Sequence, residues 1–412
     1  MRIGSTAAHL SYCTNIHAAQ GWSEVFDNIE HYAPAVKRHV CLDQPFALGL
    51  RLSDAEASEL LEGSRLDDFA QFLSQHGLYV PLLNGFPFGA FHGSPVKEGV
   101  FAPDWSQPSR LEYTLRLSNI LRRLLPPGME GSISTVPIAY KYQVVANEQA
   151  VCLEAAHNLA KSVIHLSRMR NEQGVWIHID LEPEPDGVIG RTAEAVEFFE
   201  KYLRPHGIPV LRQAMGIGKD RAAELLADHI GVCLDACHMA VEYESGEEAF
   251  DRLERSGIRT GRIQLSSAFD VSLPSDPGQR TTAAARLSEF ADGCYLHQTR
   301  ARDCNGGIHG FPDLEPALQS IHDTQLTELR VHFHVPLFED MAGSIHSTQT
   351  YTRELLQLAV KRQITRHFEI ETYTWGVLPS SMQTELTDSI ACEYQWVLAQ
   401  LAGPPVSWGK GK

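Results

Sequence analysis

Short strand-like runs and longer helix-like runs alternate along almost the whole of this 412-residue chain. Apolar residues with a two-residue period predict strands, whereas apolar residues at every third or fourth position predict helices. Their alternation predicts a parallel sheet, because crossover helices usually join successive parallel strands. The predicted strands are residues 9–14, 46–52, 79–84, 130–136, 175–182, 230–235, 262–267, 295–300, 329–335 and 368–373.

The number of strand–helix units decides between two classes of parallel sheet. Eight or more units in a chain of this length favour a closed (β/α)8 TIM barrel over an open doubly wound sheet. Neither a GxGxxG nor a GxxxxGK[ST] motif follows a predicted strand, which further disfavours the open nucleotide-binding folds. The predicted helices are residues 54–61, 66–76, 110–125, 148–170, 192–202, 219–227, 288–291, 314–322, 351–361 and 384–401.

The predicted strands outnumber those of an eight-stranded barrel by one or two. We assign the excess to an insertion between strands seven and eight, at about residues 268–328. Within it, residues 295–300 are expected to lie outside the barrel, paired antiparallel at its rim. We therefore predict one TIM-barrel domain over residues 1–402 with a C-terminal helix, followed by a flexible Pro/Gly/Lys-rich tail at 403–412.

The net charge and the cysteines indicate which partners and which cellular compartment to expect. The formal charge is 35 − 51 = −16, which argues against nucleic acid as a partner because phosphate binding needs a cationic face. The eight cysteines are scattered through the chain and are typical of reduced thiols in a cytoplasmic protein. We find no signal peptide and no bilayer-spanning apolar run, so membrane insertion is not expected.

Polar side chains on the predicted strands share the face opposite the apolar residues. The strand that ends at Glu182 also presents His178 and Asp180 on that face, and the last strand presents Glu369 and Glu371. If the apolar face meets the helices, these polar side chains point into the barrel. Unpaired charges in a packed interior are costly. A divalent metal ion at the C-terminal mouth, where the active sites of this fold lie, would neutralise such a cluster.

Asp235 and His238 form the most compact pair of potential metal ligands. Asp235 ends a predicted strand, and His238 lies in the first turn after it. A carboxylate and an imidazole at this spacing suit a divalent ion. The alternative is a buried aspartate that caps the following helix, with His238 on the helix surface.

The same reasoning gives a set of candidate site residues. The candidate metal ligands are Glu182, Asp235, His334 and Glu371, and the candidate catalytic residues are Glu182, Glu371 and His238. The metal is Zn, Mn or Mg, with its identity left open. His178, Asp180 and Glu369 lie deeper and are expected to form buried hydrogen bonds. Glu184 lies beyond Pro183 and is expected to be a loop residue around the ligands.

The loop at residues 84–93 is rich in Gly and Phe and is expected to cover the apolar part of a small substrate. The candidate substrate-binding residues are Asn84, Phe86, Phe88, His92, Gln264, His332 and Trp375.

These residues resemble the xylose-isomerase-like TIM barrels, also called AP-endonuclease-2-like, which include sugar isomerases, epimerases and endonuclease IV proteins. In that superfamily a Glu ends strand five, an Asp ends strand six with a His three residues on, a His or similar ligand follows strand seven, and a Glu ends strand eight. The residues that match in order are Glu182, Asp235, His238 and Glu371.

Two further positions separate this chain from the endonuclease IV branch. His332 and His334 stand where endonuclease IV proteins carry Asp-x-His, whereas Gln264 stands where they carry a His. This departure and the acidic charge argue against a trinuclear zinc site and a role in DNA repair.

A closer resemblance, to the EboE proteins, covers nearly the whole chain. EboE proteins are described as "metabolite traffic" proteins and are encoded in bacterial operons with a prenyltransferase-like membrane protein. The resemblance implies a role in processing or moving a small-molecule precursor, with proteins of the same operon as partners. It is carried by residues 12–17, 83–87, 131–137, 181–185, 264–268, 331–336 and 371–375.

Three functions follow as hypotheses. The leading one is a metal-dependent enzyme of the sugar isomerase/epimerase type that acts on a small polyhydroxylated or cyclic metabolite in a secondary-metabolite precursor pathway. In it, Glu182 or Glu371 moves a proton, and His238 orients the substrate or binds the metal. The second is metal-dependent hydrolysis of a phosphoester-like bond. The third is a protein that binds a metabolite and hands it on without catalysis.

Overall fold

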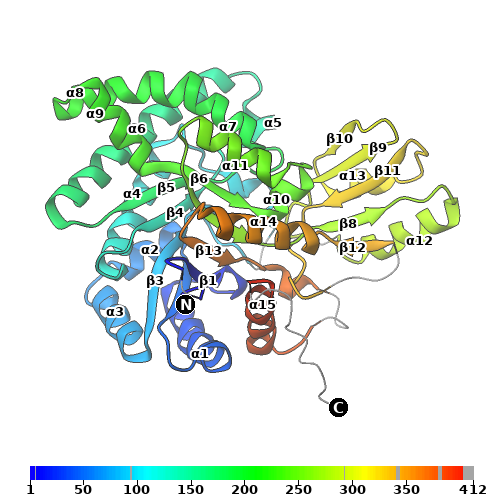
Figure 1. The fold of residues 1–412 in the computed structure, drawn as a ribbon, viewed down its shortest axis with the longest axis horizontal. Coiled ribbons are helices and arrows are strands. Elements are labelled where there is room, and N and C mark those ends of the chain that lie inside the picture. Colours follow the sequence, from blue (N-terminus) through cyan, green and yellow to red (C-terminus); the bar gives the residue numbers. More distant parts are fainter. Residues whose placement is uncertain (5, 93–94, 292, 340–343, 379–382, 402–412) are drawn as a thin grey trace, which may run out of the picture.

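The computed structural model describes residues 1–401 except for 5, 93–94, 292, 340–343 and 379–382 (Figure 1). The predicted tail at 403–412 lies outside the described residues.

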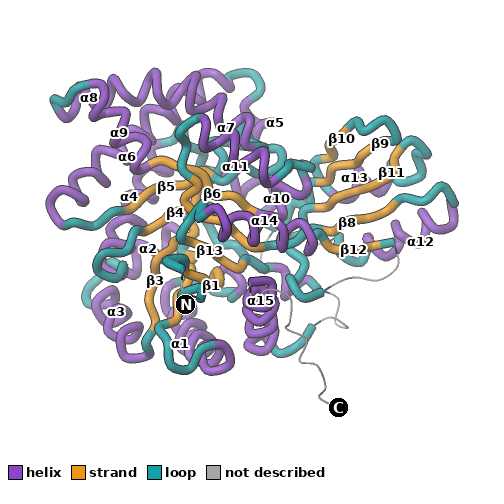
Figure 2. The backbone as a smooth tube through the Cα atoms, viewed as in Figure 1, coloured by secondary structure: helices purple, strands orange, loops and turns teal. Residues whose placement is uncertain are grey.

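Eight parallel strands close into a barrel, which confirms the predicted fold class. Around the barrel the strand order is β1-β13-β7-β6-β5-β4-β3-β2, and Figure 2 shows these strands enclosed by helices. Apolar side chains on one face of each strand meet the helices, so that the other face lines the interior. The barrel strands are β1 (His9–Cys13), β2 (Phe46–Arg51), β3 (Leu78–Asn84), β4 (Gly131–Thr135), β5 (Ile177–Leu181), β6 (Ile230–Asp235), β7 (Thr260–Leu265) and β13 (His367–Ile370).

Helices connect the barrel strands and form the outer layer. Local signals set some of their ends: Ser53 and Glu56 form a reciprocal capping box at the start of α2, and Gly77 ends α3 in a left-handed conformation. The helices of the barrel are α1 (Trp22–Val40), α2 (Asp54–Leu60), α3 (Arg65–His76), α4 (Pro108–Leu124), α5 (Lys141–Val144), α6 (Glu148–Gln173), α7 (Thr192–Phe198), the π-helical Phe199–Gly207, α8 (Ile208–Met215), α9 (Lys219–His229), α10 (Ala236–Val241), α11 (Gly246–Arg255), α14 (Gln349–Arg362) and α15 (Leu386–Leu401).

A second, antiparallel sheet lies between β7 and β13 in the sequence and beside the barrel in space (Figure 1). Its strand order is β10-β9-β11-β8-β12, and the helices α12 (Pro277–Ser288) and α13 (Leu314–Gln319) accompany it. Its strands are β8 (Phe269–Ser272), β9 (Thr299–Asp303), β10 (Ile308–Phe311), β11 (Leu326–Val331) and β12 (Ile345–Ser347).

This sheet confirms one strand prediction and corrects another. The predicted strand 295–300 overlaps β9, which pairs antiparallel outside the barrel, as expected. The prediction that the strand at 329–335 lines the barrel interior was wrong, because β11 is a central strand of the second sheet. Alternating apolar and polar side chains fit a sheet with one buried face as well as they fit a barrel strand. The alternation therefore could not show to which sheet this strand belongs.

The chain that leaves β11 crosses the barrel mouth. The amide of Val335 donates to the carbonyl of Ser267 at 2.8 Å, and the hydroxyl of Thr374 donates to the carbonyl of His334 at 2.6 Å. These bonds fasten the segment between the ends of β7 and β13. His332 and His334 thereby reach the mouth from an element outside the barrel.

The middle of the barrel interior holds a buried polar network. The guanidinium of Arg262 donates to Glu369 at 2.7 Å and to the hydroxyl of Ser132 at 2.8 Å. Asp180 accepts from Ser132 and lies 2.8 Å from Nδ1 of His178. The buried hydrogen-bonding roles predicted for His178, Asp180 and Glu369 are confirmed.

Two glycines make room for the carboxylates of this network. A Cβ at Gly49 would lie 1.6 Å from an oxygen of Glu369, and a Cβ at Gly261 would lie 2.0 Å from an oxygen of Asp180. Any larger residue at either position would displace a charged side chain inside the barrel.

Among the described residues, no helix combines the length and apolar character needed to cross a membrane.

Candidate metal centre

Three carboxylates meet at the C-terminal mouth of the barrel. Glu182 directly follows β5, Asp235 is the last residue of β6, and Glu371 directly follows β13. One oxygen from each lies within 4.8 Å of one from each of the others, and all three side chains are at least 96% buried. The structure therefore brings together three of the four residues predicted as metal ligands.

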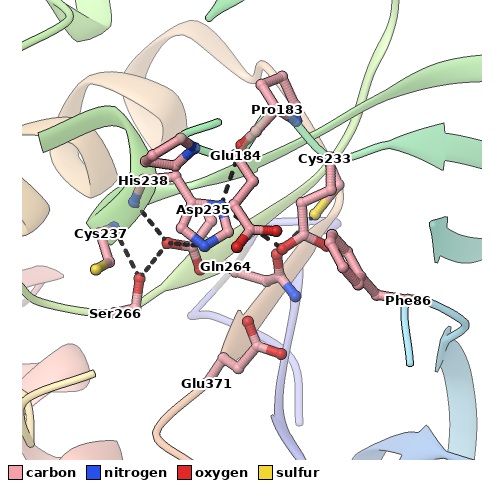
Figure 3. A network of polar contacts seen from close by, with 12 residues as sticks. Phe86, Pro183, Glu184, Cys233, Asp235, Cys237, His238, Gln264, Ser266 and Glu371 are labelled. Carbon is pink, nitrogen blue, oxygen red and sulfur yellow. Dashed lines mark hydrogen bonds and ion pairs between the residues drawn. The ribbon is translucent and has the colours of Figure 1, made fainter. Parts of the chain in front are cut away.

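Asp235 uses only one of its carboxylate oxygens within the protein (Figure 3). Its Oδ1 caps α10 by accepting the amide of His238 at 3.0 Å, and it accepts the hydroxyl of Ser266 at 2.7 Å. Its Oδ2 is buried and has no hydrogen-bond partner among the described residues. The capping role considered as an alternative is present, and it leaves the second oxygen available to a ligand.

Glu371 is held by two amide side chains. The Nδ2 atoms of Asn15 and Asn84 donate to its Oε1 at 2.9 Å and 2.8 Å. Glu182 is less constrained, since its Oε2 is buried without a partner among the described residues. The two glutamates thus differ: Glu371 is held by two hydrogen bonds, whereas Oε2 of Glu182 is left for a ligand.

Three histidines each direct Nδ1 at an acceptor. His238 lies 3.0 Å from the carbonyl of Pro183, and His334 lies 2.6 Å from the carbonyl of Glu371. His332 lies 2.7 Å from Oε1 of Gln298, whose amide nitrogen donates elsewhere. A carbonyl or amide oxygen can only accept, so Nδ1 of each ring carries the proton.

Their Nε2 atoms consequently bear lone pairs, and these face one another. Nε2 of His332 lies 3.2 Å from Nε2 of His238 and 3.3 Å from Nε2 of His334. A second-shell acceptor on Nδ1 is the usual arrangement of a metal-binding histidine. Lone pairs at such separations repel, and a cation bound among them would relieve the repulsion.

Burial sets the protonation of the carboxyl groups. Burial raises the pKa of Glu182 well above its ordinary value, and the charges of Asp235 and Glu184 raise it further. Burial likewise raises the pKa of Glu371, with added contributions from Glu182 and Asp235. Burial opposes ionisation of Asp235 too, but His238, His334 and the bond from Ser266 outweigh it and lower the pKa of Asp235 below its ordinary value.

The histidines are neutral at neutral pH. Burial lowers the pKa of His334 to about 4 and that of His332 well below its ordinary value, with His238 and His334 adding to the effect on His332. Burial also lowers the pKa of His238. Neutral imidazoles and carboxylates relieved of their protons are the donor types that divalent metals bind.

The donors fit one or two divalent ions. Asp235 belongs to two sets of potential ligands whose atoms lie within 4.8 Å of one another. Glu182 and Glu371 complete the first set, and His238 and His334 complete the second. The unpartnered oxygens of Glu182 and Asp235 supply the buried polar atoms that a missing cation would satisfy.

A cavity of about 60 Å³ lies above these ligands. Asn84, Phe86 and His332, three of the predicted substrate-binding residues, line it. Aromatic rings cover it: Phe91, Tyr295 and Tyr373 lie with ring centroids 5.1–5.2 Å apart. This volume is far below the roughly 300–1,000 Å³ typical of ligand sites, so a sugar-sized ligand requires some of the side chains that line the cavity to move.

The structure places four of the predicted substrate-binding residues outside the lining of this cavity. Phe88 packs on Tyr113 with ring centroids 5.2 Å apart, and Trp375 packs on Phe338 at 6.2 Å, so neither lines the cavity. Their aromatic character serves packing rather than binding, which sequence position alone could not distinguish.

The other two of these residues are polar. His92 lies behind the aromatic cover, where its ring nitrogens contact the carbonyl of Asn15 at 2.5 Å and the hydroxyl of Tyr295 at 2.8 Å. Gln264 lies beneath the ligands, and its Oε1 accepts from the thiol of Cys233 at 2.9 Å (Figure 3). Neither lines the cavity above the ligands.

Several residues of the site were missed as direct participants. Glu184, expected to be a loop residue, lines the cavity and lies within 4.8 Å of potential ligand atoms of His238 and His332. Asn15, Tyr295 and Tyr373 also line it. Asn15 lies just beyond the C-terminal end of β1, a position that active-site residues favour in this fold, so that rule would have found it. No sequence signal marks Tyr295.

No protein-family model matches the chain, and no curated protein sequence matches it significantly. Solved structures similar to it include a xylose isomerase-like TIM barrel protein from Mycobacterium smegmatis in complex with magnesium. That structure has 13% sequence identity and a TM-score of 0.49, and the match covers 97% of this chain and 98% of that one.

Two other similar structures each cover 96% of this chain with 12% identity and a TM-score of 0.44. One is the IOLI protein with a binding zinc atom, of which 96% is covered. The other is D-psicose 3-epimerase in the presence of D-fructose, of which 97% is covered.

Proposed function

We propose that the chain is a divalent-metal-dependent enzyme of the sugar isomerase/epimerase type, acting on a small polyhydroxylated or cyclic metabolite. The observation that carries this proposal is the convergence of Glu182, Asp235 and Glu371 with His238 and His334 around buried oxygens that have no hydrogen-bond partner in the part of the chain that the structure describes. A cluster of acidic groups and neutral imidazoles without a cation is unfavourable in a buried site.

The bound ion would grip vicinal oxygens of the substrate and polarise its carbonyl group. Around that point the chain supplies an acid–base pair, because Glu182 and Glu371 enter the mouth from different strands. Glu182, with its free Oε2, takes or returns the proton at the carbon next to the carbonyl. Glu371, fixed by Asn15 and Asn84, holds a constant orientation toward the same centre.

Closure of the aromatic residues over the cavity would keep water from the reacting carbon. Phe91, Tyr295 and Tyr373 come from three separate parts of the chain, and Tyr295 belongs to the segment between β7 and β13. The resemblance to EboE proteins supports a place for this reaction in processing a secondary-metabolite precursor. Proteins of the same operon are then the proposed partners.

Hydrolysis of a phosphoester-like bond is the second candidate, and one observation favours it. Asp235 belongs both to the carboxylate set and to the set with His238 and His334, so its carboxylate could bridge two ions. Paired ions about 3.5–4 Å apart stabilise both the attacking and the leaving oxygen of a phosphoryl centre.

The metal requirement is tested first, with Asp235→Asn. Asparagine keeps an oxygen for the capping bond from His238 but is a much weaker donor to a divalent ion. The variant should have a similar or higher thermal midpoint in chelator, because one charge leaves a crowded cluster, and a much smaller rise in midpoint on addition of Zn²⁺ or Mn²⁺.

Asp276→Asn is the matched control, since Asp276 also caps a helix, by accepting the amide of Gln279 at 2.8 Å. It should show the wild-type rise with metal. An equal rise in the Asp235→Asn protein would remove Asp235 from the site.

The reaction type is tested by incubating metal-loaded protein with a panel of small sugars, cyclic polyols and their phosphoesters in D2O. An isomerase or epimerase incorporates deuterium at the substrate carbon next to the carbonyl, whereas a hydrolase releases phosphate from phosphoesters without doing so. Binding with neither outcome across the panel would support the non-catalytic hand-over role instead.

A further inference from the structure

A second group of potential metal ligands lies at the opposite, N-terminal end of the barrel. Glu130 directly precedes β4, His178 is the second residue of β5, and His367 is the first residue of β13. One ligand atom from each lies within 4.8 Å of one from each of the others. The two histidines are at least 99% buried, and Glu130 is 9% exposed.

The histidine nitrogens in this group lack the partners that buried imidazoles normally have. Nε2 of His178 and both ring nitrogens of His367 are buried without a hydrogen-bond partner of normal geometry among the described residues. Buried polar atoms without partners are uncommon and costly. His178 and His367 each have one nitrogen with a lone pair, and two such nitrogens in one small group point to a ligand that accepts their lone pairs.

His178 is held as metal-binding histidines are held. Its Nδ1 lies 2.8 Å from Asp180, and that carboxylate is in turn bonded by the hydroxyl of Ser132. A carboxylate behind Nδ1 fixes the tautomer and leaves Nε2 as the donor atom toward a metal.

One carboxylate oxygen of Glu130 contacts Arg259, and the other faces His367. Arg259 contacts Oε2 at 3.3 Å, whereas Oε1 lies 3.9 Å from Nε2 of His367. Two metal–ligand bonds of about 2 Å can bridge such a separation. A pocket of about 290 Å³, lined by Glu130, His367 and His9 among others, opens onto the group and gives an entry path and room for a water ligand.

We propose that Glu130, His178 and His367 bind a zinc ion that joins the N-terminal ends of β4, β5 and β13. Two imidazoles and one carboxylate form a known zinc ligand set that leaves a further position for water. The ion would stabilise the fold, because it binds a geometry that exists only when the barrel is closed. This inference is independent of the function proposed for the mouth, with which it shares no residue.

The test uses full-length protein in which the mouth is already impaired by Asp235→Asn, so that the two sites are counted separately. After chelation and titration with Zn²⁺, this protein should retain about one tightly bound zinc per chain. Adding His367→Gln, or Glu130→Gln in a second variant, should remove that zinc and the accompanying rise in thermal midpoint.

His229→Gln is the matched control. His229 is also fully buried, contacts the carbonyl of Ile177 at 2.6 Å and has an unpartnered Nε2, but it belongs to none of the ligand groups among the described residues. Its variant should keep the zinc despite any loss of stability.

Retention of the zinc by both His367→Gln and Glu130→Gln would overturn the proposal, as would the absence of bound zinc in the Asp235→Asn protein. If neither added variant folds, anomalous scattering at the zinc edge from zinc-soaked wild-type crystals decides. A peak among Glu130, His178 and His367 supports the site, and a peak only at the mouth removes it.

Discussion

Asp180 and Glu369 lie in the middle of the barrel interior, and Glu182 and Glu371 lie two residues further along the same two strands, at the mouth. All four side chains are buried. The lower pair faces Arg262, which donates to Glu369 at 2.7 Å and shares Ser132 with Asp180. The upper pair faces Asp235, a further negative charge.

The two pairs of acidic residues have the same spacing on their strands but different roles. In the middle layer the protein supplies its own cation, so that the carboxylates belong to a permanent network. At the mouth, among the described residues, no Lys or Arg pairs with Glu182, Asp235 or Glu371, and burial and the charge of Asp235 raise the pKa of Glu182. A layer that lacks an internal cation has to hold protons or bind an external cation.

The largest expected effect comes from removing the internal cation. Arg262→Met leaves Glu369 and Asp180 buried without their positive partner, and breaking a buried pair in this way costs about 3–5 kcal/mol of unfolding free energy. Denaturant unfolding of chelated protein measures the loss. Adding Glu369→Gln to the variant should restore part of the stability, because the uncompensated charge is gone.

Arg123→Met is the control for this comparison. Arg123 contacts Asp67 at 2.8 Å, but its side chain is 49% exposed, so the loss should be within about 1 kcal/mol. Similar losses in the two variants would show that Arg262 does not neutralise the middle layer.

A moderate effect is expected from pH on the metal-free protein. Burial raises the pKa of Glu184 from an ordinary 4.5 to about 8, so the folded state holds a proton there that the unfolded state has lost. The contribution of Glu184 to the unfolding free energy of chelated protein should therefore fall as pH rises from about 4.5 to about 8.

The histidines change the unfolding free energy in the opposite direction and over a different pH range. Burial lowers the pKa of His334 from 6.5 to about 4, so its contribution rises with pH and is complete by about 6.5. Between pH 6.5 and 8 the contribution of the histidines is constant, so the slope comes from buried acids, among them Glu182 and Glu371, and Glu184→Gln should reduce it in part. An unchanged slope in this variant would exclude Glu184 as its source. Metal-saturated protein should lose the slope, because binding displaces the protons.

The smallest effect concerns the orientation of one ligand. Asn15→Ala removes the amide that donates to Glu371 at 2.9 Å but leaves the bond from Asn84. Loss of one such outer contact should weaken metal binding about tenfold, as measured by titration of the chelated protein.

Asn158→Ala is its control, because Asn158 is also buried and donates to a carbonyl, that of Trp105, at 2.9 Å. It should lose stability without a change in metal affinity. Equal affinities in wild type and Asn15→Ala would show that Glu371 either needs no orientation by Asn15 or is not a ligand.

Local patterns in the sequence were sufficient to predict the barrel and the carboxylates at its mouth. Side chains alternate strictly along a strand, so the parity of Asp180 with Glu182, and of Glu369 with Glu371, follows from position alone. The ends of parallel strands share one edge, which predicts that Glu182, Asp235 and Glu371 meet. The helix Trp22–Val40 was missed, although its buried Trp22, Val25, Ile29, Ala33 and Val36 have helical spacing.

Only the tertiary structure decided which residues from outside the barrel join the site. His332 and His334 reach the mouth because the segment after β11 is fastened to Ser267 and Thr374. Phe88 and Trp375 lie outside the cavity at the mouth because they pack on Tyr113 and Phe338. The physical reason is that alternation along a strand is a local property, whereas the path of a connecting segment depends on contacts between residues that are far apart in the sequence.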